Sequence, residues 1–202
     1  MIAALYVKTR GAYFGLDGVD PWDEARDARL YVGPWPVVAH PPCQRWCRFA
    51  KGIEAQYPKY AVGDDGGCFE AALRDVRAYG GVLEHPAGSL AWDYFHLPKP
   101  RSSVGWTSSL MDEGASCYVE QGRYGHPMRK ATWLYAVAPT FPTLRWGRRL
   151  DSELGACKWG SRLYKPAQDR DRPRVDGQHS LTPVAFRDEL LALARSASRE
   201  RV

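Results

Sequence analysis

The chain has 202 residues, of which 45% are hydrophobic and 25% are charged, a composition that can form a packed core and excludes a disordered or collagen-like protein. Its 28 Lys and Arg residues against 23 Asp and Glu residues give a net charge of +5, which is compatible with a polyanionic partner. No apolar stretch approaches the roughly 20 residues that a membrane-spanning helix needs, and the first residues lack a secretory signal pattern. The five cysteines are an odd number spread widely along the chain, which argues against a disulfide framework. We therefore expect one globular domain over residues 1–202, in the cytoplasm and without a membrane.

Short apolar runs alternate along the chain with stretches of helical spacing. The predicted strands cover residues 3–7, 36–39, 82–84, 117–119 and 132–137. Residues 69–79 have apolar positions at helical spacing and are followed by Gly80 and Gly81, which predicts a helix that ends there. Strands separated by helices indicate an α/β sheet, in which polar residues just after the strand ends form the sites.

The last quarter of the chain divides into a basic segment and a helix. Residues 142–180 contain nine basic and five acidic residues with little periodicity, and we expect them to form an excursion over the sheet. A C-terminal helix is predicted over 182–196, with Thr182 as N-cap and Pro183 at the first helical position. Its apolar face consists of Phe186, Leu190, Leu191 and Leu193.

Two predicted strands end in residues that can carry chemistry. The strand at 36–39 is followed by His40, two prolines and Cys43, so a stiff turn presents the thiol. The basic neighbours Arg45 and Arg48 are expected to favour its thiolate form. The strand at 82–84 ends in Glu84, and in a parallel sheet the two strand ends converge on one pocket.

Three motifs, in order along the chain, resemble those of the cytosine-5 DNA methyltransferases. The Pro-Cys-Gln at 42–44 is similar to the nucleophile motif of that family. The Leu-Glu-His-Pro at 83–86 resembles its Glu-Asn-Val strand. The Tyr-Gly-His-Pro-Met-Arg-Lys at 124–130 resembles its Tyr-Gly-Val-Pro-Gln-x-Arg-x-Arg motif.

The resemblance implies a three-layer Rossmann-like methyltransferase sheet with helices on both faces. It implies that the thiolate of Cys43 adds to C6 of a cytosine in DNA while Glu84 hydrogen-bonds the ring at N3, and C5 then takes up a one-carbon group. Arg129 would hold the base carbonyl or the catalytic loop. The donor implied is S-adenosylmethionine, and no obligate protein partner is expected.

Further residues follow from the same reading. Gly11, Asp20 and Asp27 are candidates for the cofactor, although Lys8 stands where the family has an acidic residue. Arginines interleaved with tryptophan can neutralise phosphate and stack on an exposed base. The candidate substrate-binding residues are His40, Gln44, His85, Tyr124, His126, Arg145, Trp146, Arg148 and Arg149.

Other interpretations stay open. Cys43 can be a small buried residue beside a proline turn. A metal site could draw on Cys43, Cys47, Cys68, His40 and His85, but the cysteine spacing does not match common paired ligands, and we expect no metal. The chain can also be a nucleic-acid-binding protein that keeps the fold without catalysis, or an enzyme that uses another group donor.

Overall fold

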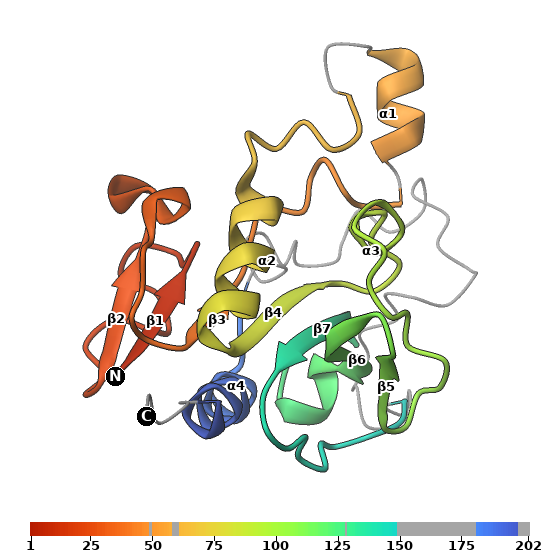
Figure 1. The fold of residues 1–202 in the computed structure, drawn as a ribbon. Coiled ribbons are helices and arrows are strands. Elements are labelled where there is room, and N and C mark those ends of the chain that lie inside the picture. Colours follow the sequence, from red (N-terminus) through yellow and green to blue (C-terminus); the bar gives the residue numbers. More distant parts are fainter. Residues whose placement is uncertain (49, 58–60, 128, 149–180, 198–202) are drawn as a thin grey trace, which may run out of the picture.

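A mixed seven-stranded sheet forms the centre of the computed structural model, which describes residues 1–48, 50–57, 61–127, 129–148 and 181–197 (Figure 1). Its strands are β1 (Ile2–Leu5), β2 (Val19–Trp22), β3 (Val37–Ala39), β4 (Gly81–Pro86), β5 (Trp106–Ser109), β6 (Asp112–Glu120) and β7 (Ala131–Val137). Their order across the sheet is β2-β1-β3-β4-β7-β6-β5.

Four neighbouring strands, β2, β1, β3 and β4, are parallel. Strand β7 is antiparallel to both β4 and β6, and β5 is antiparallel to β6. Strand β6 therefore runs in the direction of β4. The carboxyl ends of β1, β3, β4 and β6 consequently lie along one edge of the sheet, together with the residues that enter β7.

Two long helices cover opposite faces of the sheet centre (Figure 1). Helix α2 (Cys68–Tyr79) contacts β3, β4 and β7, and α4 (Val184–Ser196) contacts β4, β3 and β1. The shorter helices are α1 (Ala50–Gln56), α3 (Ala91–Tyr94) and the 3-10 turns η1 (Glu24–Arg26), η2 (Ala28–Leu30) and η4 (Gln121–Tyr124). The molecule is thus a mixed α/β protein with few helices.

Alternation along the strands separates the core into two layers. Ala4 and Val82 belong to the cluster that contains α4, whereas Leu5 and Leu83 belong to the cluster that contains α2. Successive side chains of a strand point to opposite faces, so neighbouring residues enter different layers. This alternation decides which of the polar residues at the strand ends share a face.

All five predicted strands and the helix over 69–79 are confirmed, with end shifts of a few residues. The two strands expected to be parallel, β3 and β4, are parallel neighbours, and β7 returns antiparallel beside β4. Strand β2 was not predicted because Asp20 and Pro21 are unfavourable in strands; an edge strand tolerates proline, since one side needs no ladder partner.

The C-terminal helix differs from its prediction at the start. It begins at Val184, and Pro183 occupies the cap position with extended backbone and no side-chain cap, so Thr182 is not the N-cap. The amide of Arg187 donates to the Pro183 carbonyl at 2.9 Å. The predicted apolar face is confirmed, because Phe186, Leu190, Leu191 and Leu193 are buried.

Within the described parts of the chain, no helix is both long and apolar enough to cross a membrane.

Candidate active site

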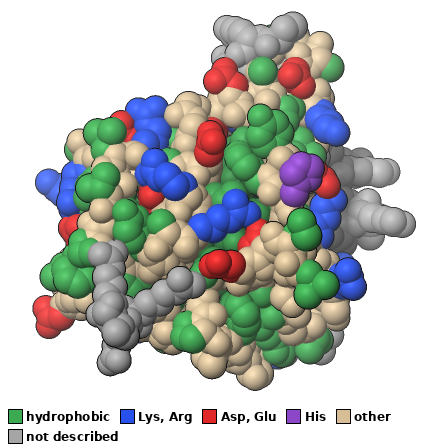
Figure 2. All heavy atoms as spheres, in the orientation of Figure 1, with side chains coloured by type: hydrophobic (Ala, Val, Ile, Leu, Met, Phe, Trp, Pro, Cys, Tyr) green, Lys and Arg blue, Asp and Glu red, His purple; other side chains and the backbone are tan. Residues whose placement is uncertain are grey.

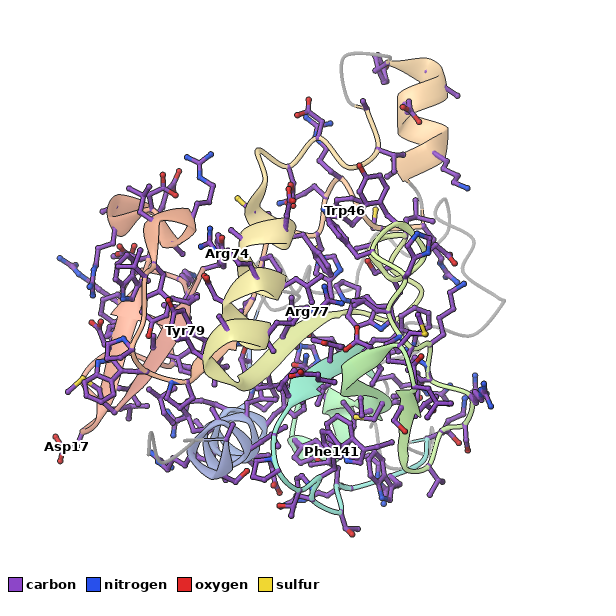
Figure 3. The ribbon with its side chains drawn as sticks, viewed as in Figure 1. Asp17, Trp46, Arg74, Arg77, Tyr79 and Phe141 are labelled. Carbon is purple, nitrogen blue, oxygen red and sulfur yellow. The ribbon has the colours of Figure 1, made fainter. Side chains whose placement is uncertain are left out.

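A tight turn after β3 presents Cys43. Its carbonyl oxygen accepts hydrogen bonds from the amides of Trp46 at 3.0 Å and Cys47 at 2.9 Å. Trp46 is 2% exposed, lies beside α3 (Figure 3), and its ring centroid is 5.7 Å from that of Phe69 and 5.6 Å from that of Phe95. Trp46 therefore packs the turn that carries the thiol against the α2 side of the core.

Glu84 lies near the end of β4, and both of its carboxylate oxygens are engaged. Oε2 is 3.0 Å from Nδ1 of His40, and Oε1 accepts from Nε2 of Gln121 at 2.9 Å. Burial acts to raise the pKa of Glu84, but the hydrogen bond and charge of His40, with the charge of Lys130, lower this pKa to about 2. The carboxylate is thus an anion in the resting protein.

Hydrogen bonds extend from Glu84 in two directions. Nε2 of His40 lies 2.8 Å from the hydroxyl of Tyr13, a side chain that is 3% exposed. On the other side, Nε2 of Gln121 also donates to Oγ1 of Thr132 at 3.0 Å. We call Tyr13, His40, Glu84, Gln121 and Thr132 the Glu84 network. It joins the β1–β2 loop, β3, β4, β6 and β7 at one edge of the sheet.

Lys130 is the cation that acts on both proposed catalytic groups. Burial lowers the pKa of Lys130, while the charges of Glu84 and Cys43 raise it. Its Nζ donates to the carbonyl of Leu181 at 2.8 Å, just before α4. Lys130 has a left-handed backbone, with φ of 41°, where the chain turns into β7.

The resemblance singled out the preceding residue, Arg129, for a different role, that of holding the base carbonyl or the catalytic loop. The carbonyl of Arg129 accepts from the amide of Gly122 at 3.0 Å, and its side chain is partly exposed. The structure thus places Arg129 beside η4, and the ammonium group of Lys130 supplies the positive charge that acts on Cys43 and Glu84.

The state of the Cys43 thiol differs from the expectation. Burial, then the charges of Glu84 and Cys47, raise its pKa, and Lys130 lowers it only in part. The prediction that basic neighbours favour the thiolate is therefore wrong for the resting protein. The same electrostatic coupling indicates that Cys43 and Glu84 lie close to one another.

His85 faces the opposite side of the sheet from Glu84. Its Nδ1 is 2.8 Å from the hydroxyl of Ser89, and its ring lies edge-on to Phe69 at 5.2 Å. Burial lowers the pKa of His85 to about 4, against the charge of Glu84. His85 is thus a neutral core residue rather than part of the face that holds Glu84.

Two other candidates near the third motif are buried. Tyr124 is 3% exposed, its ring centroid is 5.1 Å from that of Phe186, and its hydroxyl accepts from the amide of Arg145 at 2.8 Å. His126 is 1% exposed. Both side chains are placed to support the loop, whereas Gln44 is exposed in the turn beside Cys43.

Three exposed arginines gather next to η4. Nη1 of Arg123 donates to the carbonyl of Arg148 at 3.3 Å, and Nη1 of Arg145 donates to the carbonyl of Arg123 at 3.2 Å. We call Arg123, Arg145 and Arg148 the arginine cluster. Trp146 packs edge-on to Trp106 at 6.4 Å. Arg149, and most of the predicted basic excursion, lie outside the described residues.

The cofactor candidates are engaged within the protein. Asp20 pairs with Arg26 and accepts from Nε1 of Trp22 at 2.8 Å, and Asp27 pairs with Arg29 at 2.7 Å. A Cβ on Gly11 would lie 2.7 Å from the carbonyl oxygen of Lys8, so glycine is required by the close backbone turn. Each of these residues therefore has a structural role.

Some residues of the site had only weak signals in the sequence. Gln121 and Lys130 flank predicted strands at positions where α/β sheets place polar site residues, but motif matching drew attention to their neighbours. Tyr13 lies in the loop after the first strand, and Trp46 follows the Cys43 turn. Nothing in their local pattern separates these two aromatic residues from ordinary core residues.

A separate groove lies on the α2 side of the molecule. Its volume is about 740 Å³, and it is lined by Glu70, Leu73, Arg74, Arg77, Ala78, Phe95, Met111, Asp112 and Glu113. Arg74 and Arg77 project from α2 (Figure 3), and basic and acidic side chains lie next to one another across this face (Figure 2). Arg77 pairs with Asp112 at 2.6 Å across the groove. The lining contains no residue of the Glu84 network.

Among the described residues, no group of three or more His, Cys, Asp and Glu side chains is arranged to hold a metal ion. The described cysteines and histidines named above as possible metal ligands are therefore not arranged as a metal site.

Comparisons with protein-family models, with curated proteins and with solved structures find no match for this chain.

Proposed function

We propose that the protein modifies cytosine in DNA at C5 through a covalent bond between the Cys43 sulfur and C6 of the base. The observation that carries this proposal is the meeting of a cysteine and an anionic, hydrogen-bonded glutamate at the ends of adjacent parallel strands, with Lys130 acting on both. Nucleophile, carboxylate and cation are the groups that addition to an electron-poor ring requires.

Each group has a separate role in this mechanism. The thiolate of Cys43 attacks C6, and the electron pair of the C5–C6 bond moves toward C5 and N3. Glu84, held by His40 and Gln121, meets the ring at its N3 and amino edge. Lys130 stabilises the thiolate before attack and the negative charge that develops on the ring afterwards.

The order of the parallel strands supports a methyltransferase-like reading of the sheet. The chain passes from β1 to β2 on one side and then crosses to β3 on the other. In open α/β sheets, ligands bind outside the carboxyl ends of the strands where the strand order reverses in this way. His40 follows β3 at this place, and Glu84 belongs to the next strand.

The arginine cluster supports DNA as the partner. Arg123 is two residues from Gln121, which binds Glu84, so the cluster lies at the same edge as the Glu84 network. Exposed guanidinium groups bind phosphate oxygens and position a nucleic acid without reading its bases. A base inside a duplex has to be flipped out to reach Cys43.

The residues expected to hold S-adenosylmethionine do not fit it as they stand. The carboxylates of Asp20 and Asp27 are already paired with arginines, and Lys8 replaces the acidic residue of the family. We therefore derive no step through this donor. The addition of Cys43 to the base rests on the protein's own residues.

The test is nucleoside mass spectrometry on DNA from cells that express the protein, with Cys43→Ala as the matched control. A modified deoxycytidine that depends on Cys43 supports the proposal and identifies the added group. In vitro, an oligonucleotide with 5-fluorocytosine and a donor is expected to form a covalent adduct with the wild type only. Unmodified DNA and no adduct would contradict the proposal.

A second function is favoured by one observation. The raised pKa of the half-buried Cys43 thiol, which disfavours the thiolate nucleophile, suits a protein that binds nucleic acid without catalysis. Such a protein would bind DNA equally well with Cys43→Ala and would leave all nucleosides unchanged.

A further inference from the structure

We propose that His40 and Glu84 form one proton-holding pair, oriented by Tyr13, and that the proton delivered to the cytosine ring comes from His40 through Glu84. This inference rests on the proposed function and adds a positioning residue to its mechanism. The imidazole of His40 bridges two buried oxygens, the carboxylate of Glu84 at 3.0 Å and the hydroxyl of Tyr13 at 2.8 Å.

The geometry fixes where the protons lie. Because a carboxylate only accepts hydrogen bonds, Nδ1 of His40 carries a proton and donates it to Glu84. Nε2 accepts from the Tyr13 hydroxyl when His40 is neutral, and donates to the same oxygen when His40 is charged. A hydroxyl can serve in both ways, so the heavy atoms need not move when His40 gains or loses a proton.

Glu84 alone is poorly suited to donate a proton. It is an anion in the resting protein, with an oxygen held by Gln121 at 2.9 Å and the other by His40. Addition of Cys43 to C6 leaves an electron pair that N3 must accept together with a proton. A neighbouring imidazolium in hydrogen-bond contact with Glu84 is the nearest proton source that the network provides.

The step balances without another reactant. The S–C6 bond forms, the N–H bond of His40 at Nδ1 breaks, and its proton passes to Glu84. The O–H bond of Glu84 then breaks as the N3–H bond forms. When the adduct collapses, the S–C6 and N3–H bonds break, and the proton returns to the pair.

Several charged or titratable groups face this pair from the surrounding elements. Lys130, before β7, lies within electrostatic reach of Glu84, as do Cys43 and His85. Arg187 and Asp188 of α4 act on Tyr13. Lys130 and Arg187 are positive, and Asp188 and Glu84 are negative. Burial lowers the pKa of His85 to about 4, so His85 is neutral near neutral pH.

The experiment follows exchange of the hydrogen at C5 of cytosine in D₂O, which needs no group donor. Reversible addition of Cys43 to C6 lets C5 take up deuterium and lose hydrogen, and digestion to nucleosides shows the mass change. Wild type, His40→Gln, Tyr13→Phe and Cys43→Ala are compared from about pH 5 to about pH 10. His96→Asn is the control, because His96 is exposed and asparagine tolerates its positive φ of 54°.

The expected wild-type profile is bell-shaped. Exchange requires both the Cys43 thiolate and the proton held by the His40–Glu84 pair, so the rate falls at low pH and at high pH. His40→Gln lacks the fall at high pH and is slower by about a hundredfold at the wild-type maximum. Tyr13→Phe keeps the bell shape and slows exchange less than His40→Gln does, because His40 loses only the hydrogen bond that orients its ring.

Each outcome decides the inference. A His40→Gln profile with the wild-type shape, scaled by one factor at every pH, would show a structural role only and overturn it. If His40→Gln does not fold, as judged by circular dichroism, a Tyr13→Phe exchange rate equal to that of the wild type overturns it instead. If the wild type shows no exchange, both this inference and the proposed function are overturned. If the wild type shows exchange that Cys43→Ala abolishes, the proposed function stands even when the His40→Gln or Tyr13→Phe result overturns this inference.

Discussion

Replacing Glu84 by glutamine removes one buried charge and keeps the shape of the side chain. The amide can still accept from Gln121, and His40 can adopt the other tautomer to accept from the new NH₂ group. The pKa of Glu84 is lowered from an ordinary 4.5 to about 2 in the folded protein, so its charged form stabilises the fold. This difference corresponds to about 3 kcal/mol at neutral pH.

The sign gives a definite pH window. Because the folded pKa lies below the unfolded one, the stabilisation is complete above about pH 4.5 and disappears as the pH falls toward about 2. Urea unfolding at several pH values is expected to show Glu84→Gln less stable than the wild type by about 3 kcal/mol at neutral pH. The difference in unfolding free energy between the two proteins then narrows as the pH falls below about 4.5. Asp17→Asn, at an exposed turn away from the site (Figure 3), is the control and should change little. A gap of zero at neutral pH, or one that stays constant into acid, would refute the reasoning.

Four other results are expected. Alkylation of Cys43 by iodoacetamide should keep accelerating above about pH 9, because its thiol pKa is raised; a plateau near neutral pH would contradict this. Trp46→Ala should lower the unfolding free energy by about 3–5 kcal/mol, and a smaller loss in urea titration would mean that the Cys43 turn is not anchored there. Calorimetry should find weak binding of S-adenosylmethionine to the protein without nucleic acid, whereas tight binding would restore Asp20 and Asp27 as donor contacts. Replacing Arg123 and Arg145 together by alanine should reduce the slope of log affinity for DNA against log salt by about two, and an unchanged slope would mean that neither side chain contacts phosphate.

The central strands could be predicted because their signals are local. β1, β3, β4 and β7 are runs of apolar residues bounded by Gly, Pro or charged residues, and buried strands need no other signal. The edge strands lack this pattern. β2 contains Asp20 and Pro21, and β5 is half-exposed, so both depend on pairing with a strand that is already placed. Strand direction is likewise a tertiary property, and the antiparallel direction of β7 has no local signal in the sequence.

The site was predictable where chemistry and strand ends coincide, as at Cys43 and Glu84. The partners of these residues were not. Gln121 reaches Glu84 only because β6 and β4 run in the same direction on either side of β7, an arrangement without a sequence signature. The alternation that puts His40 beside Glu84 and turns His85 away could have been counted along the strands. Such a count requires the pairing register of β3 with β4, in which Ala39 lies beside Leu83.

The residues on both sides of 149–180 are hydrogen-bonded to the body of the protein. Before this segment, the Arg148 carbonyl accepts from Arg123; after it, the Leu181 carbonyl accepts from Lys130, and Arg187 of α4 donates to the carbonyl of Ala12 at 2.8 Å. The fixed points are thus supplied by the sheet and α4. Because the groups that make these contacts lie outside residues 149–180, substitutions within that range leave the hydrogen-bonding groups of Arg123, Lys130 and Arg187 unchanged.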